Sequence, residues 1–188
     1  MITIRKLLEQ DMRQAMELKA LCWTEELAGL ADDPMNVPKQ LRFWLDWMHT
    51  AQEHNDIRLL IGAFEDGNML GVAFASLADD GDIPQQGIEL NGLWVYPEYR
   101  GKGVSLRLIQ YVLDFFSLLG MEQMVIYCFH HAPSNAFYKK FGAQVNRQEY
   151  QMDGRIPVDV FLADIGQMKE RIAKSLSRRE ALPEQAEK

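Results

Sequence analysis

The chain has 188 residues, of which 47% are hydrophobic and 25% are charged, a composition typical of one globular domain with a sizeable core. Its formal net charge of −7 argues against nucleic acid as a partner, because binding a phosphate backbone requires a basic face. The two cysteines and four histidines show no metal-ligand spacing, and the apolar run at residues 59–64 is too short to cross a bilayer. The N-terminal residues also lack the apolar core of a signal peptide. We therefore expect a soluble cytoplasmic protein in which Cys22 and Cys128 are buried, reduced thiols.

The first half of the chain predicts strands on either side of a helical region. Residues 2–7 alternate like a short strand, and Asp11 is expected to cap a helix that runs to about residue 22. Residues 23–55 are rich in aromatic and acidic residues, and Pro34 and Pro38 predict short, broken helical pieces there. A buried strand at 58–64 and a strand at 69–77 follow, joined by a hairpin turn at residues 66–68.

The second half predicts an alternation of strands and helices. We expect a loop at 79–86, strands at 88–96, 124–129, 143–152 and 156–163, a helix that follows the segment 96–105 and runs to residue 119, and a short helix at 133–141. Gly120 is placed to end the first of these helices. The apolar residues Ile165, Met168, Ile172 and Leu176 share one helical face, which predicts an amphipathic helix before a polar tail. This helix is expected to pack on its own domain or to form a homodimer.

Residues 96–105, with the sequence YPEYRGKGVS, form the most informative segment of the chain. They stand where a strand pattern ends and a helix pattern begins, and they contain two glycines and two cations. Glycine lets the main chain approach a ligand closely, and the start of a helix presents unpaired N–H groups with a partial positive charge. This combination predicts a site for an anion, most often a phosphate.

Two common phosphate loops do not fit this segment. The glycines lack the third member of the dinucleotide fingerprint, and the Gly-Lys-Ser/Thr ending of nucleoside-triphosphate loops is missing. The order Arg100, two residues, Gly103, one residue, Ser105 instead resembles the acyl-CoA pyrophosphate loop of the GNAT N-acetyltransferase superfamily. Ser105 stands where that pattern has Gly or Ala, and the preceding residues 93–97 (LWVYP) resemble the strand before the loop.

The resemblance covers about residues 1–163 and implies a mixed α+β fold, with a mostly antiparallel sheet flanked by helices. It implies that the fourth and fifth strands splay apart and that acyl-CoA enters the gap, so that residues 1–163 form one catalytic domain and 164–188 a helix and tail. Acetyl-CoA is then the co-substrate, with no metal. The resemblance assigns cofactor contacts to Leu93, Trp94, Val95, Arg100, Gly101, Lys102, Gly103, Val104, Ser105, Asn135 and Tyr138.

Glu89 is the candidate base for acetylation of an amine. A lysine-like amine has a pKa near 10.4, so only roughly one molecule in 2,500 is neutral at pH 7 and a proton acceptor is needed. Strand alternation places Glu89, Asn91 and Leu93 on one face, and Leu90 and Gly92 on the other. The apolar neighbours of Glu89 predict a raised pKa. Asp82 and His131 are weaker candidates, and a solvated acid at a strand end is the alternative.

Tyr138 is the candidate acid, on the basis of the segment 135–142 (NAFYKKFG). This segment is similar to the family's helix after the fifth strand, where a Tyr four residues before a Gly faces the CoA sulfur. Two positions depart from the family pattern, since His131 and Ala143 stand where many relatives have Asn and an aromatic residue. Asn135 is expected to contact pantetheine. At most one of Lys139 and Lys140 is expected to meet a CoA phosphate, and a solvated surface position is the alternative for both. A packed aromatic is the alternative for Tyr138.

The acceptor side of the predicted site is acidic. Two segments carry acids and no lysine or arginine. Residues 20–38 contain Glu25, Glu26, Asp32 and Asp33, and residues 79–89 contain Asp79, Asp80, Asp82 and Glu89. An acidic rim attracts cationic amines, and Trp23, Trp44 and Trp47 could add aromatic faces. Acids that only keep the protein soluble, and tryptophans that belong to the core, are the alternative.

The leading hypothesis is therefore an acetyl-CoA-dependent N-acetyltransferase that acts by direct attack in a ternary complex. We expect no covalent intermediate, because neither cysteine falls in the segments predicted to line the cleft together with a matched base. One alternative is a catalytically silent module on the same fold that binds acyl-CoA or has a regulatory role. Another is a protein that binds a nucleotide phosphate.

Overall fold

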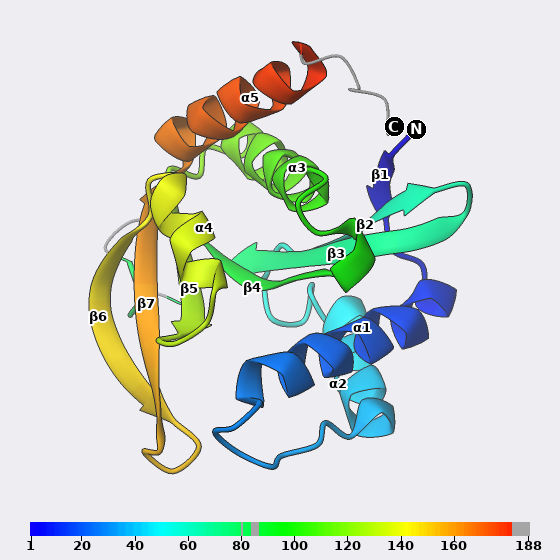
Figure 1. The fold of residues 1–188 in the computed structure, drawn as a ribbon, viewed down its shortest axis with the longest axis vertical. Helices are drawn as coiled ribbons and strands as arrows, with labels where there is room; N and C mark the ends of the chain where they lie inside the picture. Colours follow the sequence, from blue (N-terminus) through cyan, green and yellow to red (C-terminus); the bar gives the residue numbers. More distant parts are fainter. Residues whose placement is uncertain (80, 84–86, 182–188) are drawn as a thin grey trace, which may run out of the picture.

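The computed structural model describes residues 1–79, 81–83 and 87–181, which form one seven-stranded sheet in the order β1-β2-β3-β4-β5-β7-β6 (Figure 1). Neighbouring strands are antiparallel except β4 and β5, which are parallel. This arrangement confirms the predicted fold class. The strands are β1 (Thr3–Lys6), β2 (Leu59–Glu65), β3 (Asn68–Leu77), β4 (Gly87–Val95), β5 (Gln123–Phe129), β6 (Gln144–Gln151) and β7 (Ile156–Asp164).

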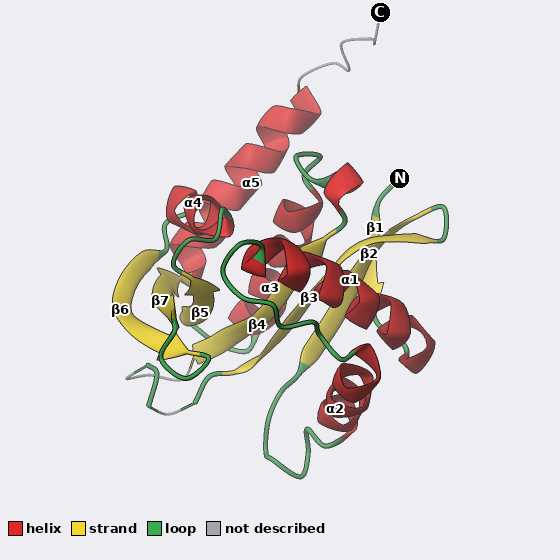
Figure 2. Cartoon of the chain, turned by 60° about the horizontal axis from the view of Figure 1, so that its bottom comes forward, coloured by secondary structure: helices red, strands yellow, loops and turns green. Residues whose placement is uncertain are grey.

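Helices cover both faces of the sheet. The helices are α1 (Glu9–Leu27), α2 (Val37–His49), the 3-10 turn η1 (Pro97–Tyr99), α3 (Val104–Leu118), α4 (Ser134–Lys140) and α5 (Ile165–Ala181). One core forms between the sheet and α3 with α5, and a second forms between the opposite face and α1 with α2 (Figures 1 and 2). Because both faces are covered, β2 reads as a nearly continuous apolar run: Leu59 and Ile61 enter the first core, and Leu60 and Phe64 the second.

The β4 and β5 strands pair over only three positions and then separate. Gly87, Ile88 and Glu89 pair with Gln123, Met124 and Val125, and no further pairs form between these strands in the described part of the chain. The other side of β4 pairs with β3 along most of its length, with a register shift between Phe74 and Ala75. The predicted splaying of the fourth and fifth strands is therefore confirmed.

The prediction that Asp11 caps the first helix is confirmed only in part, and the prediction that Pro38 breaks a helix is wrong. Asp11 does not stand at the N-cap of α1, which is Leu8; its carboxylate lies one turn in, accepts a hydrogen bond from the Leu8 N–H at 2.8 Å and pairs with Arg5. Pro38 does not break a helix but stands in the first turn of α2, where proline lacks only an N–H that would have no partner. The α2 helix therefore forms one continuous element, capped by the Asn36 side chain.

The C-terminal helix packs on its own domain. Its apolar residues Ile165, Met168, Ile172 and Leu176 are buried with the α3 residues in the first core. A homodimer through another surface stays a prediction. No helix in the described residues is both long and apolar enough to span a membrane.

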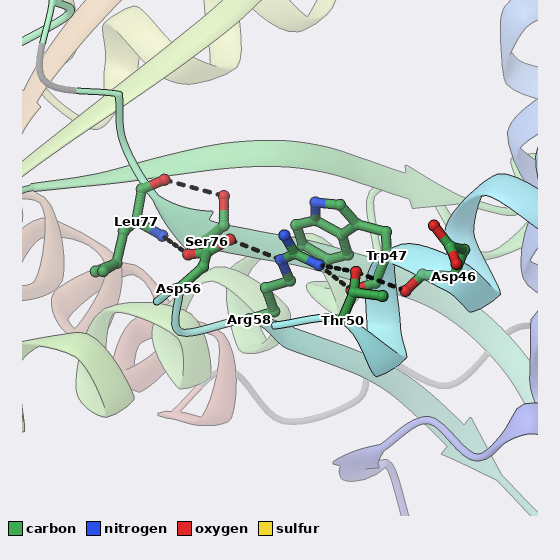
Figure 3. A network of polar contacts seen from close by, with 7 residues as sticks. All are labelled: Asp46, Trp47, Thr50, Asp56, Arg58, Ser76 and Leu77. Carbon is green, nitrogen blue, oxygen red and sulfur yellow. Dashed lines mark hydrogen bonds and ion pairs between the residues drawn. The ribbon is translucent and has the colours of Figure 1, made fainter. Parts of the chain in front are cut away.

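A buried ion pair between Asp56 and Arg58 connects the end of α2 to the end of β3 (Figure 3). The Arg58 side chain is only 6% exposed, and its guanidinium donates to Asp56 at 2.6 Å, to the Trp47 carbonyl and to the Thr50 hydroxyl at 3.1 Å. The other carboxylate oxygen of Asp56 accepts a hydrogen bond from the Leu77 N–H at 3.1 Å. One carboxylate therefore joins the segment before β2 to the end of β3.

We predict that Asp56→Ala lowers the free energy of unfolding by about 3 kcal/mol, because it leaves the Arg58 guanidinium buried without its anion. Urea denaturation followed by circular dichroism measures this loss. Asp46→Ala removes an exposed carboxylate from the same helix and should change stability by less than about 0.5 kcal/mol. Equal losses in the two variants would contradict this account of the pair.

Lys19 links α1, α2 and β4. Its ammonium donates to the Gln40 side-chain oxygen at 2.7 Å and lies 4.9 Å from the centre of the Trp44 ring and 5.4 Å from that of Trp94. The Trp44 indole N–H donates to the same Gln40 oxygen at 3.2 Å. Burial lowers the pKa of Lys19 to about 8, since water is excluded from the ammonium and no carboxylate among the described residues pairs with it.

This lowered pKa predicts that the wild-type protein gains stability relative to Lys19→Met as pH rises from 8 to 10. The unfolded chain holds the Lys19 proton up to a pKa of about 10.4, whereas the folded protein releases it near 8, so raising the pH favours folding. A full shift would give roughly 3 kcal/mol at 1.36 kcal/mol per unit, and partial exposure and the indole faces reduce the expected gain to about 1–2 kcal/mol. Urea denaturation of both proteins at the two pH values measures it. A difference that does not change with pH would contradict the prediction.

Candidate functional site

A cavity of about 410 Å³, here called the loop cavity, lies beside the segment that follows β4. It is bounded by the end of α1, the last residues of β4, the turn into α3 and the start of α4. Its lining residues are Cys22, Glu25, Glu26, Leu93, Trp94, Val95, Tyr99, Arg100, Gly101, Val104, Ser105, Pro133, Ser134, Phe137 and Tyr138.

Two left-handed glycines shape the turn into α3. Gly101 and Gly103 have φ angles of +74° and +85°, which side chains with a Cβ rarely adopt, and Gly103 is the N-cap of α3. Arg100, Gly101, Val104 and Ser105 line the loop cavity, whereas Lys102 and Gly103 are not among its lining residues. The start of a long helix therefore faces a cavity, with its first unpaired N–H groups and its partial positive charge.

Arg100 is held in place at this cavity by its neighbours. Its Nε donates to the Val95 carbonyl at 3.0 Å, and one terminal nitrogen forms an ion pair with Glu25 at 2.6 Å and contacts the Cys22 sulfur at 3.5 Å. The guanidinium therefore bridges the end of β4 and the last turn of α1. An anion that enters the cavity must compete with Glu25 for it.

A second cavity of about 500 Å³, here called the strand cavity, occupies the gap between β4 and β5. The two cavities share Glu26, Leu93, Trp94, Ser134 and Tyr138, and this shared set is called the junction below. The remaining lining residues of the strand cavity are Lys19, Trp23, Asp79, Asp82, Glu89, Leu90, Asn91, Gly92, Ile126, Tyr127, Cys128, Phe129, Gln151 and Val158.

Trp94 reaches the junction because Gly92 leaves room for it. A Cβ at Gly92 would lie 2.2 Å from the Trp94 ring, so no larger residue fits at position 92 without moving the indole. The β3–β4 register shift also changes which residues share a face. Leu90 and Leu93 both pack into the core under α3, so the predicted alternation that paired Leu93 with Glu89 is wrong. The reason is one extra residue in β4, at Asn91, opposite the step between Phe74 and Ala75.

Glu89 lines the strand cavity. Burial raises the pKa of the Glu89 carboxyl, the charges of Asp82, Asp79 and Asp56 raise it further, and the Asn91 side chain partly opposes them. Of these acids, Asp82 is itself engaged, since it accepts hydrogen bonds from the Tyr127 hydroxyl at 2.6 Å and Arg147 at 2.7 Å. A carboxyl with this environment can take a proton near neutral pH more readily than an ordinary glutamate.

Tyr138 lies at the junction and is only 6% exposed. Burial raises the pKa of its phenol, and the nearby Cys128 and Glu26 add to that effect, so the hydroxyl keeps its proton at neutral pH. Asn135 lines neither cavity; its amide donates to the Phe129 and His130 carbonyls at 3.0 and 2.8 Å and so holds the connection between β5 and α4. These bonds fix the start of the helix that carries Tyr138.

Both cysteines line a cavity, which was not expected from the sequence. Cys22 lines the loop cavity and Cys128 the strand cavity, where its sulfur lies 3.1 Å from the Ser134 hydroxyl. Cys22 is buried, whereas Cys128 is partly exposed. Burial raises the pKa of Cys128 to about 11, so the group is a thiol rather than a nucleophilic thiolate at neutral pH.

Only some residues of the predicted acidic rim line the two cavities. Glu25, Glu26, Asp79, Asp82 and Glu89 line the cavities, whereas Asp32 and Asp33 line neither, and Asp80 lies outside the described residues. Of the three tryptophans, Trp23 lines the strand cavity, Trp44 is buried in the core, and Trp47 packs on Arg58.

Sequence reasoning placed Trp23 and Glu26 near the acceptor but missed Lys19 and Cys22 on the same face of α1. Lys19, Cys22, Trp23 and Glu26 all line a cavity, and their spacing of three, four and seven residues places them on one side of the helix. That spacing was visible in the sequence, but the mixed chemistry of the four residues does not resemble a binding motif. Tyr127, Ser134 and Arg147 were also missed, and no signal in their own segments marks them.

Comparisons with known proteins agree with this geometry. A model of the "Acetyltransferase (GNAT) family" matches residues 12–143. The fold is similar to that of the PaiA N-acetyltransferase from Thermoplasma acidophilum, solved in complex with coenzyme A, with a TM-score of 0.67 and 21% identity over 87% of this chain and 99% of that one. It is also similar to YncA, a putative acetyltransferase from Salmonella typhimurium solved with acetyl-CoA, with a TM-score of 0.64 and 20% identity over 88% and 94% of the two chains.

A third similar fold is that of the ribosomal-protein-S18-alanine N-acetyltransferase from Escherichia coli, with a TM-score of 0.61 and 16% identity over 88% of this chain and 94% of that one. A search of curated proteins finds no match. The family model covers well over half of the chain, and the observed sheet, splayed strands and glycine turn agree with it. The chain therefore belongs to the GNAT family of acetyltransferases.

Proposed function

We propose that the protein is an acetyl-CoA-dependent N-acetyltransferase in which a primary amine attacks the thioester directly in a ternary complex. The observation that carries this proposal is the meeting of two cavities at the junction within the β4–β5 gap. A reaction between two bound substrates requires two sites that share one boundary, and holding the reacting atoms there lowers the entropic part of the barrier. Membership of the acetyltransferase family supports the same chemistry.

The loop cavity is the proposed cofactor site. Its glycine turn and the start of α3 offer N–H groups and a partial positive charge to a diphosphate, and Arg100 offers a full one. Beyond the last β4–β5 pair, the side of β4 that faces away from β3 has no strand partner, and main-chain groups there, within the segment Leu93–Val95, can hydrogen-bond an extended pantetheine arm. Two proteins of similar fold were solved with coenzyme A or acetyl-CoA, which supports this assignment.

The strand cavity is the proposed acceptor site, and Glu89 its base. An ammonium group must lose a proton before its nitrogen can attack, and a carboxylate with a raised pKa is suited to accept it, directly or through water. At the other side of the reaction, the Tyr138 hydroxyl donates a hydrogen bond to the sulfur as negative charge develops there.

The proposed acceptor carries positive charge. Carboxylates of Glu26, Asp79, Asp82 and Glu89 line the strand cavity, against the one cation Lys19 among its described lining residues. Such a cavity attracts small cationic amines or peptide amines and disfavours anions. A panel of amines and amino acids assayed at low salt tests this preference, and faster turnover of neutral or anionic acceptors would contradict it.

We predict that Arg100→Gln weakens coenzyme A binding by about 10- to 100-fold, the cost of losing a charge-assisted hydrogen bond to phosphate. Glu25→Gln should instead tighten binding about two- to fivefold, because the diphosphate no longer competes with an exposed ion pair. Isothermal calorimetry with coenzyme A measures both, and Arg42→Gln, on an exposed position of α2, is the control for charge. Weaker binding in Glu25→Gln would contradict the proposed competition.

We also predict that Glu89→Gln and Tyr138→Phe each lower acetyl transfer about 100-fold without changing coenzyme A affinity. Thiol release from acetyl-CoA with the amine panel measures the rate, and Glu122→Gln, an exposed acid before β5, is the control. The wild-type rate should fall as pH drops through the raised pKa of Glu89, because the base must be unprotonated, and the shape of this fall should change in Glu89→Gln.

Two results would redirect the proposal. Binding of coenzyme A without turnover of any acceptor, unchanged by either substitution, would favour a catalytically silent module on the same fold. A larger rise in melting temperature with ATP or NAD than with coenzyme A would favour a nucleotide-phosphate binder.

A further inference from the structure

The acidic side chain that the two cavities share is Glu26 and not Glu89. Among the described residues, Glu26 is the one acid that lines both the loop cavity and the strand cavity, whereas Glu89 lines only the strand cavity of the two. If the cofactor arm and the acceptor occupy these cavities, as the proposed function requires, the transferred carbonyl carbon lies at the junction. Glu26 and Tyr138 are the titratable residues of that junction.

The end of α1 is fixed firmly enough to hold Glu26 there. The main-chain carbonyl of Glu26 accepts a hydrogen bond from His131 Nε2 at 2.8 Å, and the His131 ring stacks on Phe129 at 5.8 Å between centres. The next residue, Leu27, is 2% exposed and packs with Phe129 and its neighbours at the far side of the gap. The last turn of α1 thus crosses from β4 to the end of β5 and carries Glu26 over the opening between them.

The two adjacent glutamates have different surroundings. Glu25 forms an ion pair with Arg100 at 2.6 Å, whereas no ion pair to Glu26 is formed by the described residues. Burial raises the pKa of the Glu26 carboxyl, with His131 and Arg100 acting in the opposite direction and Glu25 adding to the rise. The carboxylate also contributes to the raised pKa values of Tyr138 at the junction and of Cys128 in the strand cavity, after the larger effect of burial.

The proton balance of the reaction leaves a place for a second base. An acceptor enters as an ammonium and must lose one proton before attack and a second after the C–N bond forms, while the departing sulfur gains one. Glu89 lies on the acceptor side and suits the first transfer. It is the second transfer that takes place at the junction, where the nitrogen is bonded to the carbonyl carbon.

We propose that Glu26 is a catalytic residue that accepts this second proton as the C–N bond forms. The nitrogen lone pair forms the new bond, the carbonyl π electrons move to oxygen, and Glu26 takes a proton from the cationic nitrogen of the adduct. As the carbonyl re-forms, the C–S bond breaks and its electrons stay on sulfur. The proton held by Glu26 then passes through the Tyr138 hydroxyl to the sulfur. The proton taken by Glu89 leaves to solvent, so the products are an amide, the free thiol and one proton.

Hydroxylamine separates the two bases, because it is uncharged at neutral pH and needs no deprotonation before attack. With a protonated amine from the panel, Glu26→Gln and Glu89→Gln should each lower kcat about 100-fold. With hydroxylamine, corrected for its uncatalysed reaction with acetyl-CoA, Glu26→Gln should keep that loss and Glu89→Gln should lose less than about threefold. Glu17→Gln, an exposed position on the same helix, is the matched control.

The outcomes distinguish this inference from the function on which it rests. Glu26→Gln with unchanged coenzyme A affinity and melting temperature but reduced kcat for both nucleophiles supports the assignment. Wild-type turnover together with a kcat for Glu26→Gln within about threefold of wild type overturns it and leaves the proposed function intact. A wild-type protein that binds coenzyme A but acetylates neither nucleophile refutes the proposed function, and the role of Glu26 with it.

Discussion

The separation of β4 from β5 after three residue pairs is the constraint on which the rest of the site depends. Parallel strands in the middle of a sheet normally satisfy each other's main-chain groups, and unpaired groups in a buried gap are costly. Here β4 stays in the sheet through its pairing with β3, and β5 through its pairing with β7, so the gap can remain open. The opening holds the strand cavity and presents main-chain groups to whatever enters it.

The elements around the gap contribute different chemistry because each is fixed by a separate set of contacts. The turn after β4 places two left-handed glycines and the start of α3 at one end. The α1 helix, held by Lys19 against Gln40 and by Leu27 against β5 and β7, crosses the opening and supplies acids. Asn135 holds the connection into α4 and thereby the tyrosine at the junction. A protein with a net charge of −7 thus places Arg100 and the positive start of α3 at one end of the site and the larger number of carboxylates at the other.

The sequence was sufficient for the parts of the fold that depend on local patterns. The order of strands and helices, the glycine turn and the apolar face of the last helix all follow from periodicity and from residues with special backbone preferences. Prediction from the sequence was wrong where one local pattern is compatible with two structures. A proline can begin a helix as well as end one, and Pro38 begins α2. Strict alternation along β4 does not hold, because the extra residue at Asn91 moves Leu93 to the other face. Lys19 and Cys22 could not be assigned to the site, because their place in it depends on a helix crossing strands about 65 residues away in sequence.

The burial of Tyr138 bears on how the departing sulfur obtains its proton. An ordinary phenol is already a weaker acid than a thiol by about 1.5 pKa units, or roughly 2 kcal/mol, and burial at the junction raises the pKa of Tyr138 further. A free phenolate is therefore too unfavourable to be a separate intermediate, and Tyr138 is suited to hydrogen-bond the sulfur and to pass on a proton that arrives from another group. In the proposed reaction that group is Glu26, whose carboxyl receives a proton just before the sulfur needs one. Protonation of the sulfur therefore uses both side chains as one relay: the carboxyl of Glu26 supplies the proton, and the phenol of Tyr138 makes the contact with sulfur.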